Sequence, residues 1–277
     1  MEISEILSRH GFSFKKGLGQ NFITDTGLLA AVVRDAGVRK EDCVVEIGTG
    51  AGTLTRVISA NASEVKSFDV DESLKPVLAE TLAGLRNVEM FFKDVLRTDD
   101  SEIERITGGK PFKVVANIPY YITTPLIMRF LESGLKVTSM TLMVQEEVAA
   151  RLSALPGSAD YGAITVAVNL RGDVRVTRKV PRGVFRPVPK VDSAVVRIDV
   201  YEKYPAPDVK AASLLARAAF QMRRKTLVNN IGALSGYNKE QAAEALEKMG
   251  LDLRIRGETL SAEEFVRLAK ILSEPKG

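Results

Sequence analysis

The sequence predicts an α/β fold, in which a doubly wound, mostly parallel sheet ends in an antiparallel hairpin and a small α-helical domain follows. Two observations support this prediction. Up to about residue 200, short apolar, β-branched runs typical of buried strands alternate with helical patterns. Beyond Pro207 the apolar pattern is helical throughout. A chain of 277 residues can hold one large domain and one small one.

The composition excludes several classes of protein. Apolar residues make up 45% and charged residues 27%, as in ordinary globular proteins, and the net charge of +4 permits an anionic partner. The only cysteine is Cys43 and the only histidine is His10, so we expect no disulfide, no metal site and no serine-histidine triad. No apolar run approaches the ~18 residues of a membrane span. Glu2 and Glu5 argue against a signal peptide, and we expect a cytoplasmic protein.

The N-terminal segment, residues 1–22, begins with a short helical pattern and then becomes rich in glycine and lysine. Lys15 and Lys16 lie beside aromatic residues, which predicts a mobile cationic segment that ends in a defined turn. A solvated basic tail is the alternative. Thr24 or Asp25 is then a good N-cap for a helix that extends to Gly37.

A glycine loop follows the first long strand. The strand at residues 43–47 runs into the sequence Gly48-Thr49-Gly50-Ala51-Gly52, and residues 54–58 look helical. Asp69 ends the next strand, 21 residues after Gly48, where its carboxylate could accept hydrogen bonds from ribose hydroxyls. The Gly-x-Gly-x-Gly spacing favours a nucleoside without a pyrophosphate, such as S-adenosylmethionine. A merely structural turn is the alternative.

Two more strands end in polar side chains. A helix spans residues 72–84, a third strand spans residues 88–92, and Asp94 lies just beyond that strand, where it could accept from an adenine amino group. A helix N-cap or a loop acid is the alternative for Asp94. The fourth strand, which begins near Lys113, ends at Asn117-Ile118-Pro119-Tyr120.

This Asn-Ile-Pro-Tyr sequence has the groups that a flipped-out adenine would need. The Asn117 amide can accept from an exocyclic amino group, and the Tyr120 ring can stack on a base. A strand-end turn with a buried tyrosine is the alternative. Thr124-Pro125 then predicts a helix start, with threonine as the cap and proline at the first position.

The remaining pattern completes both domains. We predict a fifth strand at residues 138–145, a hairpin from the alternating pattern of residues 173–180 and the run 193–200, and a linker at 201–207. The expected domains are therefore residues 1–203 and 204–277.

Five motifs, in order, give the chain an end-to-end resemblance to the bacterial small-subunit (16S) rRNA adenine N6,N6-dimethyltransferases, the dimethyladenosine transferase family. Two positions depart from the family pattern: the ribose acid, often Glu, is Asp69 here, and the position after Asn-Ile-Pro-Tyr, often Asn, is Tyr121. The motifs are Gly19-Gln20-Asn21-Phe22-Ile23, Glu46-Ile47-Gly48-Thr49-Gly50, Asn117-Ile118-Pro119-Tyr120, Phe185-Arg186-Pro187-Val188-Pro189-Lys190-Val191-Asp192-Ser193 and Arg223-Arg224-Lys225-Thr226.

The resemblance implies a Rossmann-like class I methyltransferase sheet that uses S-adenosylmethionine. Residues 1–203 would form the cofactor-binding catalytic domain, and residues 204–277 a helical rRNA-binding domain. Asn117, Tyr120 and Phe185 are the expected catalytic residues, with Phe185 on the face of the base opposite Tyr120; a core anchor for its loop is the alternative for Phe185. The resemblance implies cofactor contacts from Asn21, Ile23, Gly48, Asp69, Asp94 and Asn117, of which Asn21 and Ile23 rest on the resemblance alone.

The same resemblance implies a substrate and a partner. The enzyme would methylate N6 of two adjacent adenines in the small-subunit rRNA of a pre-ribosomal small subunit, acting as a monomer without a metal or a membrane. Residues 171–197 hold eight cationic side chains against Asp173 and Asp192, which together with Lys15, Lys16 and residues 223–225 predicts a cationic rim for phosphates.

Three other functions compete with this interpretation. One is the large-subunit rRNA adenine methyltransferase of macrolide resistance, which shares Asn-Ile-Pro-Tyr. A DNA adenine methyltransferase fits less well, since those enzymes usually carry Asp-Pro-Pro-Tyr or Asn-Pro-Pro-Tyr. The third is a non-catalytic ribosome-assembly factor, against which the intact glycine loop and Asn117 argue.

Overall fold

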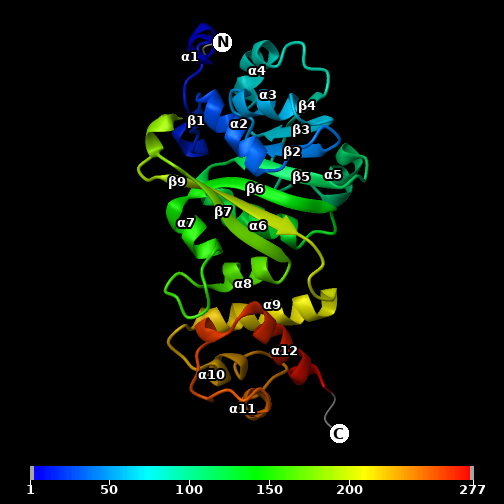
Figure 1. Cartoon of the computed structure of the whole chain (residues 1–277), viewed down its shortest axis with the longest axis vertical. Coiled ribbons are helices and arrows are strands. Elements are labelled where there is room, and N and C mark those ends of the chain that lie inside the picture. Colours follow the sequence, from blue (N-terminus) through cyan, green and yellow to red (C-terminus); the bar gives the residue numbers. More distant parts are fainter. Residues whose placement is uncertain (1–2, 275–277) are drawn as a thin grey trace. The chain divides into compact units, whose positions relative to one another are not determined.

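The computed structural model describes residues 3–274, which fall into two compact units (Figure 1). The first unit comprises the chain up to residue 149 together with residues 175–200. The second comprises residues 150–174 and the chain from residue 201 onward. This division differs from the expected boundary between residues 203 and 204, because residues 150–174 belong with the helical unit.

Apolar packing explains why this inner segment belongs to the second unit. Tyr161, Val166 and Leu170 are buried in the same cluster as Leu215 and Ala219, which lie on a C-terminal helix. The Tyr161 hydroxyl also donates to the carbonyl oxygen of Leu260, at 2.8 Å. The segment therefore completes the core of the helical unit.

The first unit is built on a seven-stranded sheet with the order β4-β3-β2-β5-β6-β9-β7. Neighbouring strands from β4 to β6 are parallel, whereas β9 is antiparallel to β6. The predicted doubly wound sheet with an antiparallel hairpin at its end is therefore confirmed. Its strands are β2 (Cys43–Ile47), β3 (Glu64–Asp69), β4 (Val88–Phe92), β5 (Phe112–Asn117), β6 (Val137–Gln145), β7 (Gly172–Val180) and β9 (Ser193–Val200).

The chain order of the sheet reverses between β2 and β5, at its centre. Every residue of β2 is buried, as expected for a parallel strand with both faces covered. In open α/β sheets, ligands bind at the carboxyl ends of the strands beside such a reversal. The glycine loop after β2 and the Asn-Ile-Pro-Tyr sequence after β5 both lie at this point.

The helices of this unit pack apolar side chains toward the sheet. Leu29 and Val32 of α2, for example, are buried in one cluster with Val44 and Val65 of the central strands. Asp25 caps α2 as predicted, since its carboxylate accepts from the Leu28 N–H at 3.0 Å. The helices are α2 (Thr26–Asp35), α3 (Thr53–Ser59), α4 (Lys75–Thr81), α5 (Asp100–Thr107), α6 (Thr123–Leu131) and α7 (Glu146–Leu152).

The predicted start of α6 is wrong. The helix expected to begin at Thr124-Pro125 begins at Thr123, because the 3₁₀ turn η3 (Tyr120–Ile122) leads directly into α6. Pro125 still lies in the first turn, where its missing N–H leaves no intrahelical hydrogen bond unmade.

The N-terminal segment is packed against the first unit. Its predicted helix is α1 (Ile3–Arg9), which buries Ile6 in a cluster with Val77 of α4. A 3₁₀ turn, η1 (Lys16–Leu18), then leads to the two-residue strand β1 (Phe22–Ile23), which pairs with β8 (Phe185–Arg186). The alternative of a solvated basic tail is therefore wrong for the described part of this segment.

The second unit is helical, as predicted for the C-terminal part of the chain. Its helices surround one apolar cluster that contains Leu227, Leu246 and Phe265. No helix within residues 3–274 has the length and apolar character needed to cross a membrane. The helices are α8 (Ala163–Asn169), α9 (Ala206–Gln221), α10 (Leu227–Ile231), α11 (Lys239–Lys248) and α12 (Ala262–Ser273), with a 3₁₀ turn, η5 (Gly257–Thr259), before α12.

Candidate active site

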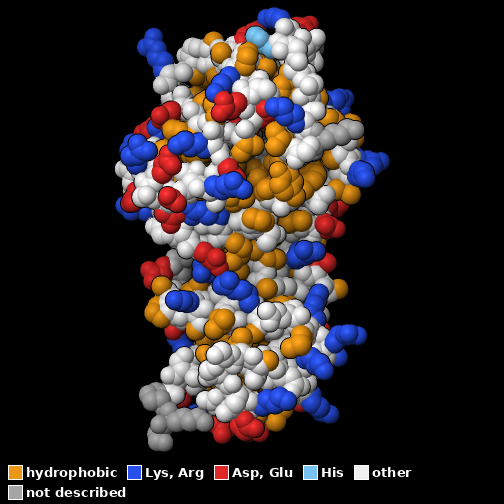
Figure 2. All heavy atoms as spheres, turned by 180° about the vertical axis from the view of Figure 1, so that it is seen from behind, with side chains coloured by type: hydrophobic (Ala, Val, Ile, Leu, Met, Phe, Trp, Pro, Cys, Tyr) orange, Lys and Arg blue, Asp and Glu red, His pale blue; other side chains and the backbone are white. Residues whose placement is uncertain are grey.

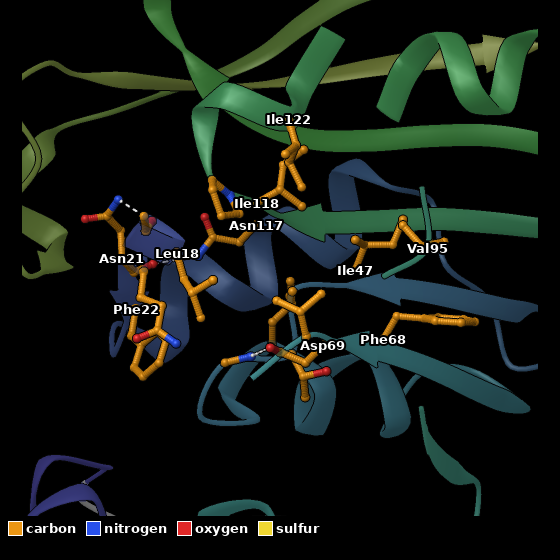
Figure 3. Close-up of a pocket in the computed structure, with 18 of the residues that line it drawn as sticks. Leu18, Asn21, Phe22, Ile47, Phe68, Asp69, Val95, Asn117, Ile118 and Ile122 are labelled. Carbon is orange, nitrogen blue, oxygen red and sulfur yellow. Dashed lines mark hydrogen bonds between the residues drawn. The ribbon is translucent and has the colours of Figure 1, made fainter. Parts of the chain in front are cut away.

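A cavity of about 560 Å³ lies at the carboxyl ends of β2, β3 and β5 (Figure 3). Its walls come from the N-terminal segment, the glycine loop, the residues after β3 and β4, and the Asn-Ile-Pro-Tyr sequence. All of the predicted site residues except Phe185 line it. These are Asn21, Ile23, Gly48, Asp69, Asp94, Asn117 and Tyr120.

The glycine loop lies too close to its neighbours for a side chain. Gly48 has φ +78°, and a Cβ there would lie 3.0 Å from the Asn117 carbonyl oxygen. Gly50 has φ +55°, and a Cβ there would lie 2.9 Å from the Phe22 ring. Both positions thus need glycine for its backbone conformation and for the close approach.

Asp69 is held in place by the loops on either side of it. Its Oδ2 accepts from the Gly50 N–H at 2.9 Å (Figure 3), and its Oδ1 accepts from the Asp71 N–H at 2.8 Å. Burial raises the pKa of Asp69, although these hydrogen bonds partly oppose the rise. A carboxylate oxygen accepts more than one hydrogen bond, so Asp69 can still bind hydroxyl groups in the cavity.

Asp94 lies on the loop after β4. Its Oδ1 accepts from the Leu96 N–H at 3.0 Å, which makes a tight local turn. The N-cap of the next helix, α5, is Asp99. The helix-cap alternative for Asp94 is therefore wrong, and its carboxylate belongs to a loop that lines the cavity.

A second buried acid, Glu46, lies beneath the glycine loop and was not among the predicted site residues. Its side chain is fully buried in β2, and its Oε2 accepts from the Ser67 hydroxyl at 2.7 Å. The Ser67 and Thr49 hydroxyls are 2.6 Å apart, which links Glu46 to the loop. Burial raises the pKa of Glu46 to about 8. An acid within the apolar run Val44-Val45-Glu46-Ile47 was the available sequence signal.

The amide of Asn117 has a defined orientation. Its Nδ2 donates to the Asn21 carbonyl oxygen at 3.0 Å, as the dashed line in Figure 3 marks. Because a backbone carbonyl only accepts, the amide nitrogen must face Asn21 and Oδ1 must face away from it. Asn117 lines the cavity, so this oxygen remains available as an acceptor at the end of β5.

Tyr120 lies beside Asn117 in the 3₁₀ turn after β5. Its hydroxyl oxygen is 2.8 Å from the Ser193 hydroxyl oxygen, while the residue itself lines the cavity. Burial raises the pKa of the Tyr120 phenol, which favours the neutral form. Tyr121, the departure from the family pattern, is 65% exposed at the rim.

Phe185 does not face the cavity. It is fully buried, and it packs in the core with Ile23, Leu54 and Val180. Its strand β8 pairs with β1, which holds the side chain beneath the N-terminal segment. The expected position of Phe185 on the second face of a target base is therefore corrected: in this structure it is the core anchor of its loop.

The predicted cationic rim is partly neutralised. Within residues 171–197, four cations form ion pairs with carboxylates outside that range: Arg175 and Arg197 with Asp199, both at 2.7 Å, Arg178 with Asp35 at 3.1 Å, and Lys179 with Glu146 at 2.8 Å. Figure 2 likewise shows Lys and Arg interspersed with Asp and Glu on the face that it presents.

Three further cations of the rim lie in the connection between β7 and β9, which contains β8. Within residues 3–274, Arg182 and Arg186 donate to backbone carbonyl oxygens, and Lys190 has no acidic partner. In the second unit, Arg223 pairs with Glu258 at 3.4 Å. The side chain of Lys16 lies outside the described part of the structure. No group of three or more possible metal ligands occurs among the described residues.

The sheet order, the glycine loop and Asp69 at the end of β3 together define a Rossmann-like methyltransferase fold. Residues 11–274 match the family described as "Ribosomal RNA adenine dimethylase", and the chain belongs to this family.

Individual relatives agree with this assignment. The chain is 41% identical over 273 residues to the ribosomal RNA small subunit methyltransferase A of Clostridioides difficile (strain 630), covering 97% of this chain and 94% of the relative. The structure of a dimethyladenosine transferase from Plasmodium falciparum is similar with a TM-score of 0.76 at 25% identity, covering 89% of this chain and 95% of that one. The 23S rRNA methyltransferase ErmE is similar with a TM-score of 0.71 at 27% identity, covering 92% and 100%.

Proposed function

We propose that this protein transfers methyl groups from S-adenosylmethionine to N6 of two adjacent adenines in small-subunit rRNA, which gives N6,N6-dimethyladenosine. The observation that carries the proposal is the Asn117 amide, whose nitrogen is engaged by the Asn21 carbonyl so that its oxygen is left to accept from a substrate. The family match supports adenine dimethylation, and the relative from Clostridioides difficile supports the small subunit.

The cavity has the groups that an adenosine-containing methyl donor needs. Gly48 and Gly50 let the loop backbone lie directly against Asn117 and Phe22, because a Cβ at either position would meet these neighbours. Asp69 would accept from the ribose hydroxyls and Asp94 from the adenine amino group of the donor. Asn21, Ile23 and Asn117 would complete its surroundings. When bound, S-adenosylmethionine supplies a methyl group on a positively charged sulfur, which is an activated leaving group.

The residues after β5 would make the target nitrogen reactive. The N6 lone pair of adenine is delocalised into the ring, so the amine is a poor nucleophile. The Asn117 Oδ1 and the backbone carbonyl of Ile118 would accept its two N–H groups and draw the nitrogen toward tetrahedral geometry, which frees the lone pair. No side-chain base is needed, because the methylated nitrogen is acidic and can release its proton to water.

Positioning of the target adenine against the methyl donor would account for most of the rate enhancement. Fixing two reactants in a reactive geometry is worth up to ~7–11 kcal/mol. Tyr120 would stack on the target base, an interaction worth ~1–3 kcal/mol. Its hydroxyl is held by a hydrogen bond with the Ser193 hydroxyl. With Phe185 buried, the second face of the base is left to another group.

The remaining parts of the proposal concern the partner. We propose that the substrate is the rRNA of a pre-ribosomal small subunit in the cytoplasm, that the helical unit binds this rRNA, and that the enzyme acts as a monomer. The cations in the connection between β7 and β9 would contact phosphates, which positions an RNA without specifying its sequence. An unpaired adenine in a defined RNA shape would supply the specificity.

Transfer of a labelled methyl group tests the proposal. Unmethylated small subunits, large-subunit rRNA and duplex DNA would each be offered with labelled S-adenosylmethionine. We expect N6,N6-dimethyladenine in the small subunit alone. Label in large-subunit rRNA would instead indicate the resistance type of enzyme. Tight binding to small subunits without any label would indicate an assembly factor.

A further inference from the structure

We propose that Asp71 is a positioning residue for the methyl transfer proposed above, on which this inference rests. Asp71 fastens the N-terminal loop, residues 15–21, and this loop in turn fixes the amide of Asn117. A series of hydrogen bonds thus links Asp71, in the loop after β3, to Asn117 at the end of β5 by way of the N-terminal loop.

The carboxylate of Asp71 binds the N-terminal loop at two points. Its Oδ1 accepts from Lys15 Nζ at 2.5 Å, and its Oδ2 accepts from Gln20 Nε2 at 2.7 Å. The Asp71 side chain is only 1% exposed, whereas that of Lys15 is 47% exposed, so the carboxylate is the buried end of this ion pair. Ser73 completes the set, since its N–H and its hydroxyl both donate to Oδ1. Burial alone would raise the pKa of Asp71, but the hydrogen bonds from Lys15, Ser73 and Gln20 lower it, which keeps the carboxylate charged.

The N-terminal loop is closed on itself by further hydrogen bonds. The Lys15 N–H donates to Gln20 Oε1 at 2.9 Å, so the two residues that bind Asp71 also bind each other. Asn21 Nδ2 donates to the Gly19 carbonyl oxygen at 3.1 Å. Gly19 has φ +59°, and a Cβ there would lie 3.0 Å from Cβ of Pro119. The loop therefore lies directly against the Asn-Ile-Pro-Tyr sequence.

The loop acts on the chemistry through one atom, the carbonyl oxygen of Asn21. This oxygen accepts from Asn117 Nδ2 at 3.0 Å, and Gln20, the residue before it, is held by Asp71. If the loop shifts, the Asn117 amide loses the acceptor that decides its orientation. A rotated amide would present N–H groups to the N6 amino group of adenine, which is itself a donor. The residues that bind S-adenosylmethionine would stay in place, but Asn117 Oδ1 would no longer accept from the adenine amino group.

A matched ion pair in the same unit provides a control. Lys113 Nζ lies 2.7 Å from Asp42 Oδ2, with side chains 15% and 20% exposed, and this pair does not line the cavity. Asp42→Asn therefore removes a partly buried ion pair without touching the N-terminal loop. Asp71→Asn removes the charge at the proposed position with little change in shape, but it turns an amide N–H group toward donors that need an acceptor.

The experiment combines kinetics with hydrogen exchange on the full-length protein. The variants are Asp71→Asn, Lys15→Met, Lys15→Arg and Asp42→Asn. For Asp71→Asn we expect kcat with saturating S-adenosylmethionine and unmethylated small subunits to fall by about 10- to 10²-fold, as for a small misplacement of a reacting group. Lys15→Met should lower kcat less, Lys15→Arg should keep it, and Asp42→Asn should leave it unchanged.

Hydrogen exchange separates positioning from general loosening, and it needs no substrate RNA. Asp71→Asn should speed amide exchange in residues 12–24 and leave the central strands β2 and β5 as protected as in the unmodified protein. Unchanged kcat, unchanged exchange in residues 12–24, or faster exchange across β2 and β5 would each overturn the inference. An unmodified protein that methylates none of the offered substrates would refute the proposed function, whereas the exchange result would still decide whether Asp71 fastens the loop.

Discussion

The hydroxyl oxygens of Tyr120 and Ser193 lie 2.8 Å apart, so one hydrogen bond joins the Asn-Ile-Pro-Tyr sequence after β5 to the first residue of β9. Ser193 is 1% exposed and belongs to the motif that begins at Phe185. Two motifs that are more than 60 residues apart in the sequence are thus joined at the hydroxyl of Tyr120. The motif that begins at Phe185 therefore holds Tyr120 through Ser193, whereas its own aromatic residue, Phe185, is buried in the core.

This relationship predicts a graded effect at Tyr120. Ser193→Ala and Tyr120→Phe each remove one hydrogen bond, worth ~0.5–1.5 kcal/mol, and should slow methyl transfer by about 3- to 10-fold. Tyr120→Ala should cost more, because it also removes a stacking interaction of ~1–3 kcal/mol. Steady-state methyl-transfer rates check the order. If Tyr120→Phe were as slow as Tyr120→Ala, the hydroxyl and not the ring face would be the important group.

Gly50→Ala should weaken binding of S-adenosylmethionine and destabilise the protein. The new methyl would lie 2.9 Å from the Phe22 ring at a residue with φ +55°. The left-handed conformation alone costs about 1–2 kcal/mol. Gly84→Ala is the matched control, since Gly84 has φ +81° and a Cβ there would meet nothing within 4 Å. Calorimetric titration and thermal unfolding of both variants should show a shared loss of stability but a loss of binding only for Gly50→Ala.

Glu46 should make stability depend on pH. Its pKa is raised from an ordinary 4.5 to about 8 by burial, so the folded protein holds a proton that the unfolded chain releases. The stability contributed by the protonated group is therefore full below pH 4.5 and is lost as the pH rises through about 8. The loss is at most about 1.4 kcal/mol per pH unit in this window. Glu46→Gln should remove this component, which thermal unfolding of both proteins from pH 5 to about 8.5 would measure. Parallel curves for the two proteins would contradict the assignment.

The ion pairs of the hairpin predict which cations bind RNA. In the described residues the side chains of Arg182 and Lys190 form no ion pair, although the Arg182 N–H donates to Asp192 Oδ1 at 2.9 Å, whereas Arg175 and Arg178 are paired with Asp199 and Asp35. The double change Arg182→Gln and Lys190→Gln should lower affinity for small-subunit rRNA and reduce the salt slope by about 0.7–0.9 per lost phosphate contact. The control, Arg175→Gln with Arg178→Gln, should change the slope less. Filter binding at several salt concentrations gives both slopes, and equal slopes would refute the distinction.

The sequence predicted the sheet and most of the cavity because both follow from local patterns. Buried parallel strands appear as short apolar runs, and their carboxyl ends converge. Gly48, Asp69, Asp94 and Asn117 could therefore be placed together from strand ends alone, and they line one cavity.

Features that depend on distant partners could not be predicted in this way. The burial of Phe185 follows from the pairing of β1 with β8, which no local pattern indicates. The partners Asp35 and Glu146, which neutralise part of the expected cationic rim, lie far from it in the sequence. The β-branched run within Ala163–Asn169 would favour a strand, but its packing against α9 makes it a helix of the second unit.

Methyl transfer by Asn117→Ala tests the central claim most directly. Unmodified protein and variant would be given labelled S-adenosylmethionine and unmethylated small subunits, with circular dichroism and thermal unfolding to establish that both are folded. We expect the folded variant to transfer no detectable methyl, because the acceptor for the adenine amino group is gone. A folded Asn117→Ala variant that methylates small subunits at the unmodified rate would contradict the role proposed for this cavity.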